Sequence, residues 1–249
     1  MIQKKLQYVS ISVILVMLVG LIVLPPLMKS SFAAAAATQT KKPNFLLIVG
    51  DDFGYSDIGP FGSEIKTPNF DALAKDGKIL TNYHTGPTCS PGRLSLLTGV
   101  DYHIGGMGTM YELMAPNQVG KPGYQTYINN NVTTIAELLR NAGYHTFLTG
   151  KWHLSGSTPG GQPGTLPYDR GFEHTLSLLQ DGANHFNGLE YVPGWAVTFT
   201  EDGKVVPRPG NGTLTDLYTD KLISYLNHTH SDGKPFFAPS SSYPISGPT

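Results

Sequence analysis

The chain has 249 residues, a formal net charge of −1, 29 glycines, 19 prolines and a single cysteine. The near-neutral charge and the lack of a long basic run give no basis for a nucleic-acid partner. One cysteine excludes a disulfide within the chain, and the many glycines and prolines indicate numerous loops around a modest set of regular elements.

The N-terminal segment, residues 1–37, predicts export. Lysines precede an apolar stretch from Leu6 to Met28, and an alanine run ends at Ala37. This pattern is typical of a signal peptide cleaved near Ala37. The apolar stretch also approaches the about 20 residues that span a bilayer, so an uncleaved membrane anchor is the alternative. We expect a secreted or extracytoplasmic protein, membrane-anchored in that second case, with residues 38–42 as a linker.

Sequons for N-glycosylation begin at Asn131, Asn211 and Asn227. They would carry glycans if the host glycosylates exported proteins, although short motifs of this kind often match by chance.

Residues 44–49 predict a strand that is buried on both faces. The run is continuous and apolar, which is typical of a parallel sheet covered by helices. Asp51 and Asp52 follow directly, at the strand end where open α/β sheets bind their ligands. Two adjacent carboxylates repel each other unless they are compensated, so they are candidate ligands for a hard cation such as Ca²⁺. A pair of solvated turn aspartates is the alternative.

The next predicted elements are a helix and a second strand. Thr67 is the expected N-cap of a helix that ends at Asp76 and packs on the core, with Pro68 in its first turn. A strand over residues 78–83 would then return the chain to the edge of the sheet that carries the aspartates.

Cys89 lies at the N-terminus of a predicted helix. Pro91 is favoured in a first turn, and residues 93–97 read as a short, partly buried helix. The free N–H groups and the helix dipole at this end favour an anion, and the guanidinium of Arg93 suits a sulfate or phosphate oxygen. A buried structural cysteine is the alternative.

The segment 100–130 is rich in glycine and has no periodicity, so we interpret it as a long loop at the rim of a substrate pocket. His103 and Tyr111 are weak candidates for substrate contacts. Thr134 and Glu137 form a capping box that begins a helix ending at Gly143. The expected apolar face of this helix consists of Ile135, Leu138 and Leu139.

A third strand is predicted over residues 144–148, and Lys151 and His153 follow it at the same edge of the sheet, unless they merely form a polar turn. Residues 181–186 read as a polar loop that helps to shape the pocket. The remaining predicted elements are a hairpin turn at 201–204, a helix capped by Thr215 whose apolar face holds Leu217, Tyr218, Leu222, Tyr225 and Leu226, and a strand over 234–238.

Three of these segments together resemble the type I sulfatases, the arylsulfatase family. They are residues 43–54 with the paired aspartates, the Cys-x-Pro-x-Arg run with Leu-Thr-Gly at 89–99, and Gly-Lys-Trp-His at 150–153. The resemblance implies an α/β fold of the alkaline phosphatase-like kind, a mostly parallel sheet sandwiched by helices. It covers residues 43–238, which would be the N-terminal part of a sulfatase catalytic domain.

The resemblance also implies a cofactor set. A formylglycine-generating enzyme would oxidise Cys89 to formylglycine, and Asp51, Asp52 and residue 89 would share one Ca²⁺. The activity implied is hydrolysis of a small-molecule or glycan sulfate ester. In the family, one hydroxyl of the hydrated aldehyde attacks sulfur and the second expels sulfate.

Further catalytic roles follow from the same resemblance. Lys151 would bind formylglycine and the sulfate, His153 would hold the formylglycine hydroxyl, and Arg93 would offset negative charge. The likeness ends beyond residue 238. Ser246 lies near the position of a sulfate-binding histidine of the family, and residues 239–249 read as an irregular tail.

We therefore interpret the chain as a C-terminally truncated sulfatase with an incomplete site, since no aspartate follows Asp232 and no asparagine follows Asn227 to supply the family's further calcium ligands. Two alternatives stay open. A phosphatase or phosphonate monoesterase on the same scaffold would use the same cation, Arg and Lys. A non-catalytic fragment is the other. A cysteine-dependent hydrolase is the least favoured, because nothing marks a thiol-activating His–Asn pair.

Overall fold

The structure, a computed structural model, describes residues 41–190 and 192–242. The described residues from Pro43 onward belong to one compact unit. The predicted signal peptide or anchor therefore lies outside the described residues. Within the described part, no helix combines the length and the apolar character needed to cross a bilayer.

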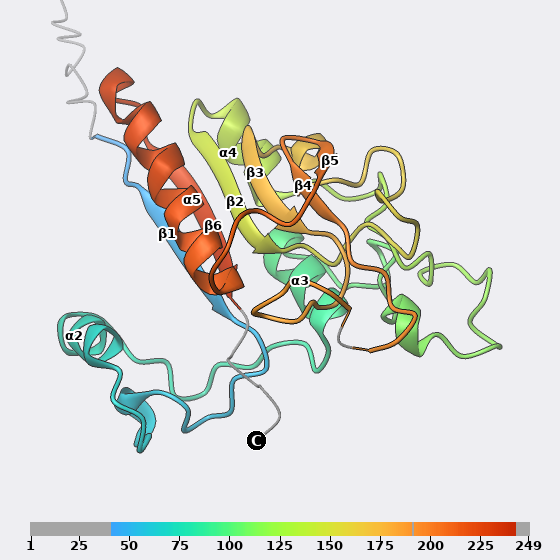
Figure 1. The fold of residues 1–249 in the computed structure, drawn as a ribbon, viewed down its shortest axis with the longest axis horizontal. Helices are drawn as coiled ribbons and strands as arrows, with labels where there is room; N and C mark the ends of the chain where they lie inside the picture. The colour runs from blue at the N-terminus through green and yellow to red at the C-terminus, as the bar shows by residue number, and fades with distance from the viewer. Residues whose placement is uncertain (1–40, 191, 243–249) are drawn as a thin grey trace, which may run out of the picture. The chain divides into compact units, whose positions relative to one another are not determined.

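A mixed sheet of six strands organises the described part of this unit (Figure 1). The strands are β1 (Phe45–Gly50), β2 (His145–Lys151), β3 (His174–Leu178), β4 (Phe199–Glu201), β5 (Lys204–Val206) and β6 (Phe236–Ser242). Their order across the sheet is β1-β6-β2-β3-β4-β5. Strands β1, β6, β2 and β3 run parallel to one another. Strand β4 pairs antiparallel with β3, and β5 pairs antiparallel with β4. All parallel strands therefore end at one edge.

Helices cover both faces of the sheet. The helices are α2 (Pro68–Asp76), α3 (Cys89–Thr98), α4 (Ile135–Asn141) and α5 (Leu214–Thr229). Alternation along β2 shows which helix covers which face, because neighbouring side chains of a strand point to opposite sides. Phe147 packs with Leu222 and Tyr225 of α5. Leu148 packs with residues of α3 and α4, among them Leu94. The predicted fold class, a mostly parallel sheet sandwiched by helices, is confirmed.

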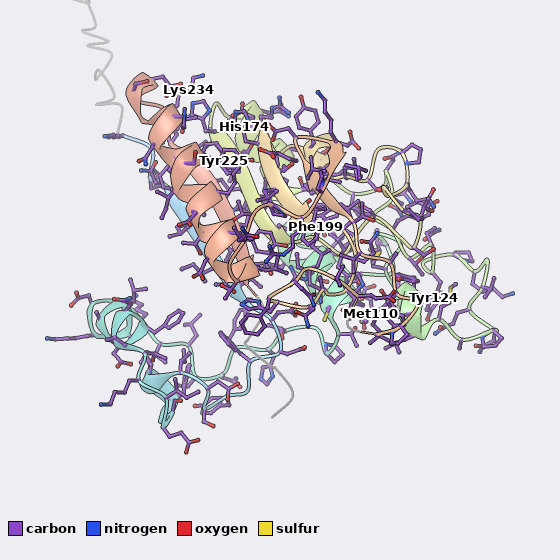
Figure 2. The ribbon with its side chains drawn as sticks, viewed as in Figure 1. Met110, Tyr124, His174, Phe199, Tyr225 and Lys234 are labelled. Carbon is purple, nitrogen blue, oxygen red and sulfur yellow. The ribbon has the colours of Figure 1, made fainter. Side chains whose placement is uncertain are left out.

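Aromatic side chains join α5 to the strands beneath it. The Tyr225 ring stacks on Phe147 at 5.8 Å and on His174 at 5.3 Å between centroids, and Figure 2 shows Tyr225 and His174 next to each other. The Tyr225 hydroxyl also donates a hydrogen bond to the Thr175 carbonyl at 3.1 Å. One aromatic residue thus ties α5 to both β2 and β3.

Two local predictions are confirmed in atomic detail. The Glu137 N–H donates to Thr134 Oγ1 at 3.1 Å and the Thr134 N–H donates to Glu137 Oε2 at 2.6 Å, which is a complete capping box at the start of α4. The β4–β5 hairpin turns at Asp202 and Gly203, both with positive φ, as such tight turns require.

Two predictions in the first part of the unit are wrong. Residues 78–83 form no strand, and β1 is exposed rather than buried on both faces. Strand β1 pairs with β6 along one side, and Leu46 and Ile48 remain 56% and 51% exposed. The continuous apolar pattern is typical of a central strand, whereas among the described residues β1 is an edge strand of the sheet.

Helix α2 has the predicted bounds but not the predicted packing role. It holds no buried residue, and Leu73 is 64% exposed. The expected N-cap, Thr67, makes no capping hydrogen bond; its Oγ1 accepts from the Gly59 N–H at 2.8 Å and donates to Asp71 at 3.3 Å. The hydroxyl is therefore engaged with a neighbouring turn instead of the helix end.

Other boundaries differ from the predictions. Strand β2 runs on to Lys151, and β3 was not predicted. Helix α5 begins at Leu214, where Thr213 rather than Thr215 accepts the Asp216 N–H at 3.2 Å. Strand β6 continues to Ser242, four residues beyond the predicted strand end and into the segment expected to be an irregular tail. On α4, Ile135 and Leu138 are exposed at 40% and 59%, and Ala136 is the buried residue instead.

Candidate active site

The residues predicted to carry the chemistry come together where the parallel strands end. Asp51 and Asp52 follow β1, and Lys151 ends β2. Cys89 is the first residue of α3, so its backbone lies at the positive end of a ten-residue helix. Gly150, with φ +105°, permits the close approach of β2 and β6, because a Cβ there would lie 1.9 Å from the Ser241 carbonyl oxygen.

The site contains a buried ion-pair network of Asp51, Arg93, Lys151 and Asp181. Asp51 Oδ2 lies 3.1 Å from Arg93 Nη2 and 3.0 Å from Lys151 Nζ. Lys151 Nζ also lies 2.9 Å from Asp181 Oδ1, and its side chain is only 2% exposed. Charges this deeply buried are stable only when they are paired, so these groups hold one another in place.

The network shifts the pKa of its members. Burial acts to raise the pKa of Asp51, but the Arg93 and Lys151 cations outweigh it and the pKa lies below its usual value. Burial and Arg93 act to lower the pKa of Lys151, while Asp51 and Asp181 raise it above its usual value. The network therefore contains an ionised Asp51 and a charged Lys151 at neutral pH.

Arg93 is fixed by partners from two strands. Its Nη1 donates to the Lys151 carbonyl at 2.8 Å, and its Nη2 donates to Ser241 Oγ at 2.8 Å as well as to Asp51. Its Nε is buried and has no hydrogen-bond partner within the described chain. The guanidinium thus joins the ends of β2 and β6 to Asp51, which follows the end of β1.

Cys89 is a poor thiol nucleophile in this setting. Its Sγ lies 3.6 Å from Asp51 Oδ1, and burial is the main reason that the pKa of the thiol is raised above its usual value. A raised pKa reduces the thiolate fraction that a cysteine-dependent hydrolase needs. The geometry therefore does not favour thiol chemistry at position 89.

The donor atoms around Cys89 fit a hard cation in part. Ligand atoms of Asp51, Asp52 and Cys89 lie within 4.8 Å of one another. Carboxylate oxygens are the donors that Ca²⁺ prefers, and the ion takes about 6–8 of them. A thiol is not such a donor, so residue 89 would suit calcium only after conversion to an oxygen-bearing side chain. Asp181 forms a second group with Cys89 and His153 within the same 4.8 Å limit.

His153 is held beside the network from three directions. It adopts φ +59°, unusual for a residue with a side chain, and its N–H donates to the Leu179 carbonyl at 3.1 Å. Its Nδ1 lies 3.5 Å from Asp181 Oδ1, and its Nε2 lies 3.2 and 3.3 Å from the two carboxylate oxygens of Glu112. Burial lowers the pKa of the His153 imidazole below its usual value.

The two loop candidates differ in position. His103 is 44% exposed and contacts Asp101 Oδ1 at 3.1 Å and Tyr124 Oη at 3.3 Å, away from the ion-pair network. Tyr111 is half-buried, and its pKa is raised to about 12, mainly by burial and then by the adjacent Glu112 and by Asp181. Tyr111 therefore lies close to the site, and His103 does not join it.

Three residues that contact the predicted site, Glu112, Asp181 and Ser241, were not predicted as site residues. Glu112 stands between Tyr111 and Leu113 in the long loop. A lone carboxylate between apolar residues can indicate burial, but the segment has no periodicity from which to identify buried positions. Asp181 was assigned to a polar loop but not to an ion pair. Ser241 lay in the expected tail, where nothing in the sequence indicated a contact with Arg93.

Comparison with known proteins gives consistent matches. A family model described as Sulfatase matches residues 43–241. An uncharacterized sulfatase of Schizosaccharomyces pombe is 48% identical over 184 residues, which is 73% of this chain and 30% of that protein. An arylsulfatase of Klebsiella aerogenes is 39% identical over 207 residues, which is 82% of this chain and 43% of that protein.

The fold also matches solved structures. The protein BT4656, solved in complex with its substrate D-glucosamine-2-N,6-O-disulfate, aligns with a TM-score of 0.63 and 27% identity, over 84% of this chain and 35% of that one. Across these three matches, the chain spans between 30% and 43% of the partner's length.

Proposed function

Because the chain belongs to the sulfatase family, we propose that its site serves the hydrolysis of a sulfuric ester. The observation that carries this proposal is the convergence of Arg93 and Lys151 on the Asp51 carboxylate next to Cys89, at the N-terminus of α3. Two fixed cations and a helix N-terminus suit a sulfuryl group that bears negative charge.

Conversion of Cys89 to formylglycine is part of the proposal. It would give residue 89 an oxygen nucleophile in place of a thiol whose pKa is raised by burial, which lowers the thiolate fraction. A formylglycine-generating enzyme would be the partner in maturation, and the Cys-x-Pro-x-Arg run at residues 89–93 is the segment that it would act on.

Calcium is the proposed metal, held by Asp51, Asp52 and the oxygen of the converted residue 89. These ligand positions lie within 4.8 Å of one another. When bound, calcium would supply positive charge that offsets the charge of the sulfate ester and of an oxygen nucleophile. Calcium takes about 6–8 oxygens, so these three residues would supply part of its coordination.

The remaining residues would act directly on the ester. Arg93 and Lys151 would stabilise negative charge on the sulfuryl oxygens, since both are already fixed by buried partners and need no reorganisation. His153, adjacent to Asp181, would orient the reacting side chain at position 89. A small-molecule or glycan sulfate ester is the proposed substrate class, in keeping with the sulfated sugar bound by BT4656.

Export is the proposed fate of the chain. The signal peptide or anchor over residues 1–37 would direct residues 43–238, the N-terminal part of a sulfatase catalytic domain, across a membrane. The sequon residues Asn131, Asn211 and Asn227 are all exposed, so each is accessible to glycosylation in a host that performs it.

Matched ester substrates test the proposal. Protein made in a host that matures other sulfatases should hydrolyse p-nitrophenyl sulfate faster than a Cys89→Ala variant does. It should also hydrolyse the sulfate at least about tenfold faster than p-nitrophenyl phosphate. Sulfate turnover no higher than that of Cys89→Ala would contradict the proposal and favour a non-catalytic sulfatase-like chain.

Phosphoryl or phosphonyl transfer is the second candidate. The same pair of cations, Arg93 and Lys151, offsets charge on a phosphoryl group as well as on a sulfuryl group. A preference for p-nitrophenyl phosphate or a phosphonate monoester in the same comparison would establish this candidate instead.

A further inference from the structure

A buried carboxylate from the long loop reaches the predicted site. Glu112 lies in the short 3₁₀ helix Tyr111–Leu113, and its side chain is only 1% exposed. Both of its oxygens lie within hydrogen-bond distance of His153 Nε2, at 3.2 and 3.3 Å. A carboxylate buried to this degree needs a hydrogen-bond donor, and His153 Nε2 is the ring nitrogen in contact with it.

The loop around Glu112 is anchored in the core. Met110 is 8% exposed, and Met107 is fully buried in the cluster that contains Trp152, the residue before His153. Figure 2 labels Met110, which precedes the short 3₁₀ helix that holds Glu112. The Leu113 N–H donates to the Met110 carbonyl at 3.2 Å and closes the turn. Glu112 is therefore held against His153 by packing on its N-terminal side and not by the ion contact alone.

The other ring nitrogen of His153 faces the ion-pair network. Its Nδ1 is buried, has no hydrogen-bond partner within the described residues, and lies 3.5 Å from Asp181 Oδ1. Ligand atoms of His153, Asp181 and Cys89 lie within 4.8 Å of one another. A neutral imidazole has one donor and one acceptor nitrogen, so the partner of Nε2 determines what Nδ1 can do.

We propose that Glu112 is a positioning residue that fixes the tautomer of His153. By accepting the Nε2–H, the Glu112 carboxylate keeps the proton on Nε2 and leaves Nδ1 as an acceptor beside residue 89. The acceptor would then receive a hydrogen bond from a hydroxyl on the converted residue. This last step rests on the proposed function, whereas the tautomer does not.

The tautomer can be read directly by NMR on the chain as it exists. Long-range ¹H–¹⁵N correlation spectra of histidine-labelled protein distinguish a protonated from an unprotonated ring nitrogen, and a His153→Asn variant assigns the signals. We expect Nε2 of His153 to carry the proton and Nδ1 to be free of it. A proton on Nδ1, or on both nitrogens, would overturn the proposal.

Variants of Glu112 separate positioning from a merely structural role. Glu112→Gln keeps a carbonyl acceptor and should retain the Nε2–H tautomer, whereas Glu112→Ala should give a mixture of the two tautomers. Glu173→Gln is the matched control, because Glu173 contacts a different histidine, His145, at 2.8 Å. It should leave the His153 signals unchanged. An unaltered tautomer in a folded Glu112→Ala variant would also refute the proposal.

Kinetics in protein with a converted residue 89 give a second readout. Glu112→Ala should lower kcat by roughly tenfold, with KM changed less than about twofold, as is usual for a residue that orients a functional group. Glu112→Gln should recover most of that loss. If no variant turns over sulfate while the tautomer responds as expected, the positioning role stands and the proposed function fails.

Discussion

Lys151 is the single residue on which most of the buried charge depends. Its ammonium contacts both Asp51 at 3.0 Å and Asp181 at 2.9 Å, and Arg93 donates to its carbonyl. Two carboxylates that share one buried cation are stable only while the cation is present. The lysine therefore has a structural effect that can be measured without any substrate.

Lys151→Met should destabilise the chain by about 3 kcal/mol, because it leaves buried carboxylates without their cation. Urea unfolding of the two proteins measures the difference. Lys221→Met is the matched control, since Lys221 pairs with Glu201 at a partly exposed position and should change stability by less than about 1 kcal/mol. Equal effects of the two substitutions would contradict the buried network.

The sequence predicted individual site residues better than their partners. Cys89 and the paired aspartates stand in short, dense patterns at the ends of predicted elements, so their neighbourhood follows from parallel topology. Glu112 and Ser241 contact His153 and Arg93 across 41 and 148 positions of the chain. Contacts at such separation leave no local pattern, and only the folded chain reveals them.

His145, at the start of β2, joins the segments that lead into β3 and β6 at the opposite edge of the sheet. Its Nδ1 lies 2.8 Å from Glu173 before β3, and its Nε2 lies 2.7 Å from Asp232 before β6. Arg140 and Lys234 flank these carboxylates at 3.8 and 3.5 Å. Burial acts to lower the pKa of His145, but the hydrogen bonds that its ring donates to Glu173 and Asp232 outweigh burial and raise the pKa above its usual value.

This contact should make stability depend on pH. Because the folded-state pKa of His145 is raised, its contribution is complete below the usual pKa near 6.5 and is lost as pH rises through the folded value. His145→Gln should therefore lower Tm at pH 5.5 by roughly 2 °C more than at pH 8.5, a small effect for a partly exposed pair. An equal loss of Tm at both pH values would contradict this role. In a Glu173→Gln background the effect of His145→Gln should depend less on pH, and an undiminished pH dependence there would also contradict it.

The capping box of α4 should make a measurable contribution to the free energy of unfolding. Thr134 Oγ1 accepts the Glu137 N–H and donates to the Arg170 carbonyl at 2.8 Å, so Thr134→Ala removes both contacts. We expect a loss of about 1–2 kcal/mol in urea unfolding of unglycosylated protein. The adjacent Thr133 is exposed and serves as control, since Thr133→Ala should have almost no effect. A comparable loss in both variants would show that the cap is not the cause.

Helices and turns with short-range sequence signals formed as predicted, whereas strands that depend on pairing with a distant segment were predicted less well. The α4 capping box and the β4–β5 turn are short-range patterns, and both formed as predicted. Residues 78–83 have the composition of a strand but form none in the structure, and β3 was missed. Strand formation depends on a neighbour to pair with, and that information is not local.

At the scale of the whole molecule, β1 presents apolar side chains to solvent. Phe45, Leu46 and Ile48 are 43%, 56% and 51% exposed, and helix α2 buries none of its residues. The sequence pattern of β1 correctly predicted a parallel strand but not its place at the end of the described sheet. Burial on both faces requires segments that the described residues do not supply.

The exposed strand should bind hydrophobic dyes. We expect the chain to enhance ANS fluorescence, and Leu46→Lys to reduce that signal while changing stability by less than about 0.5 kcal/mol, because the side chain is already solvated. Phe237→Lys, on the neighbouring strand, is the contrast, since Phe237 is 3% exposed and its replacement should unfold the chain. Dye binding that Leu46→Lys leaves unchanged would place the apolar surface elsewhere.

The proposed function depends above all on the oxidation of Cys89 to formylglycine by a maturation enzyme, and mass spectrometry tests this step most directly. The peptide that contains Cys89 should be about 18 Da lighter than its sequence predicts, the change from thiol to aldehyde, in protein from a host that matures other sulfatases. A Cys89→Ala variant provides the reference. An unmodified cysteine in that host would contradict the account and leave the chain without its proposed nucleophile.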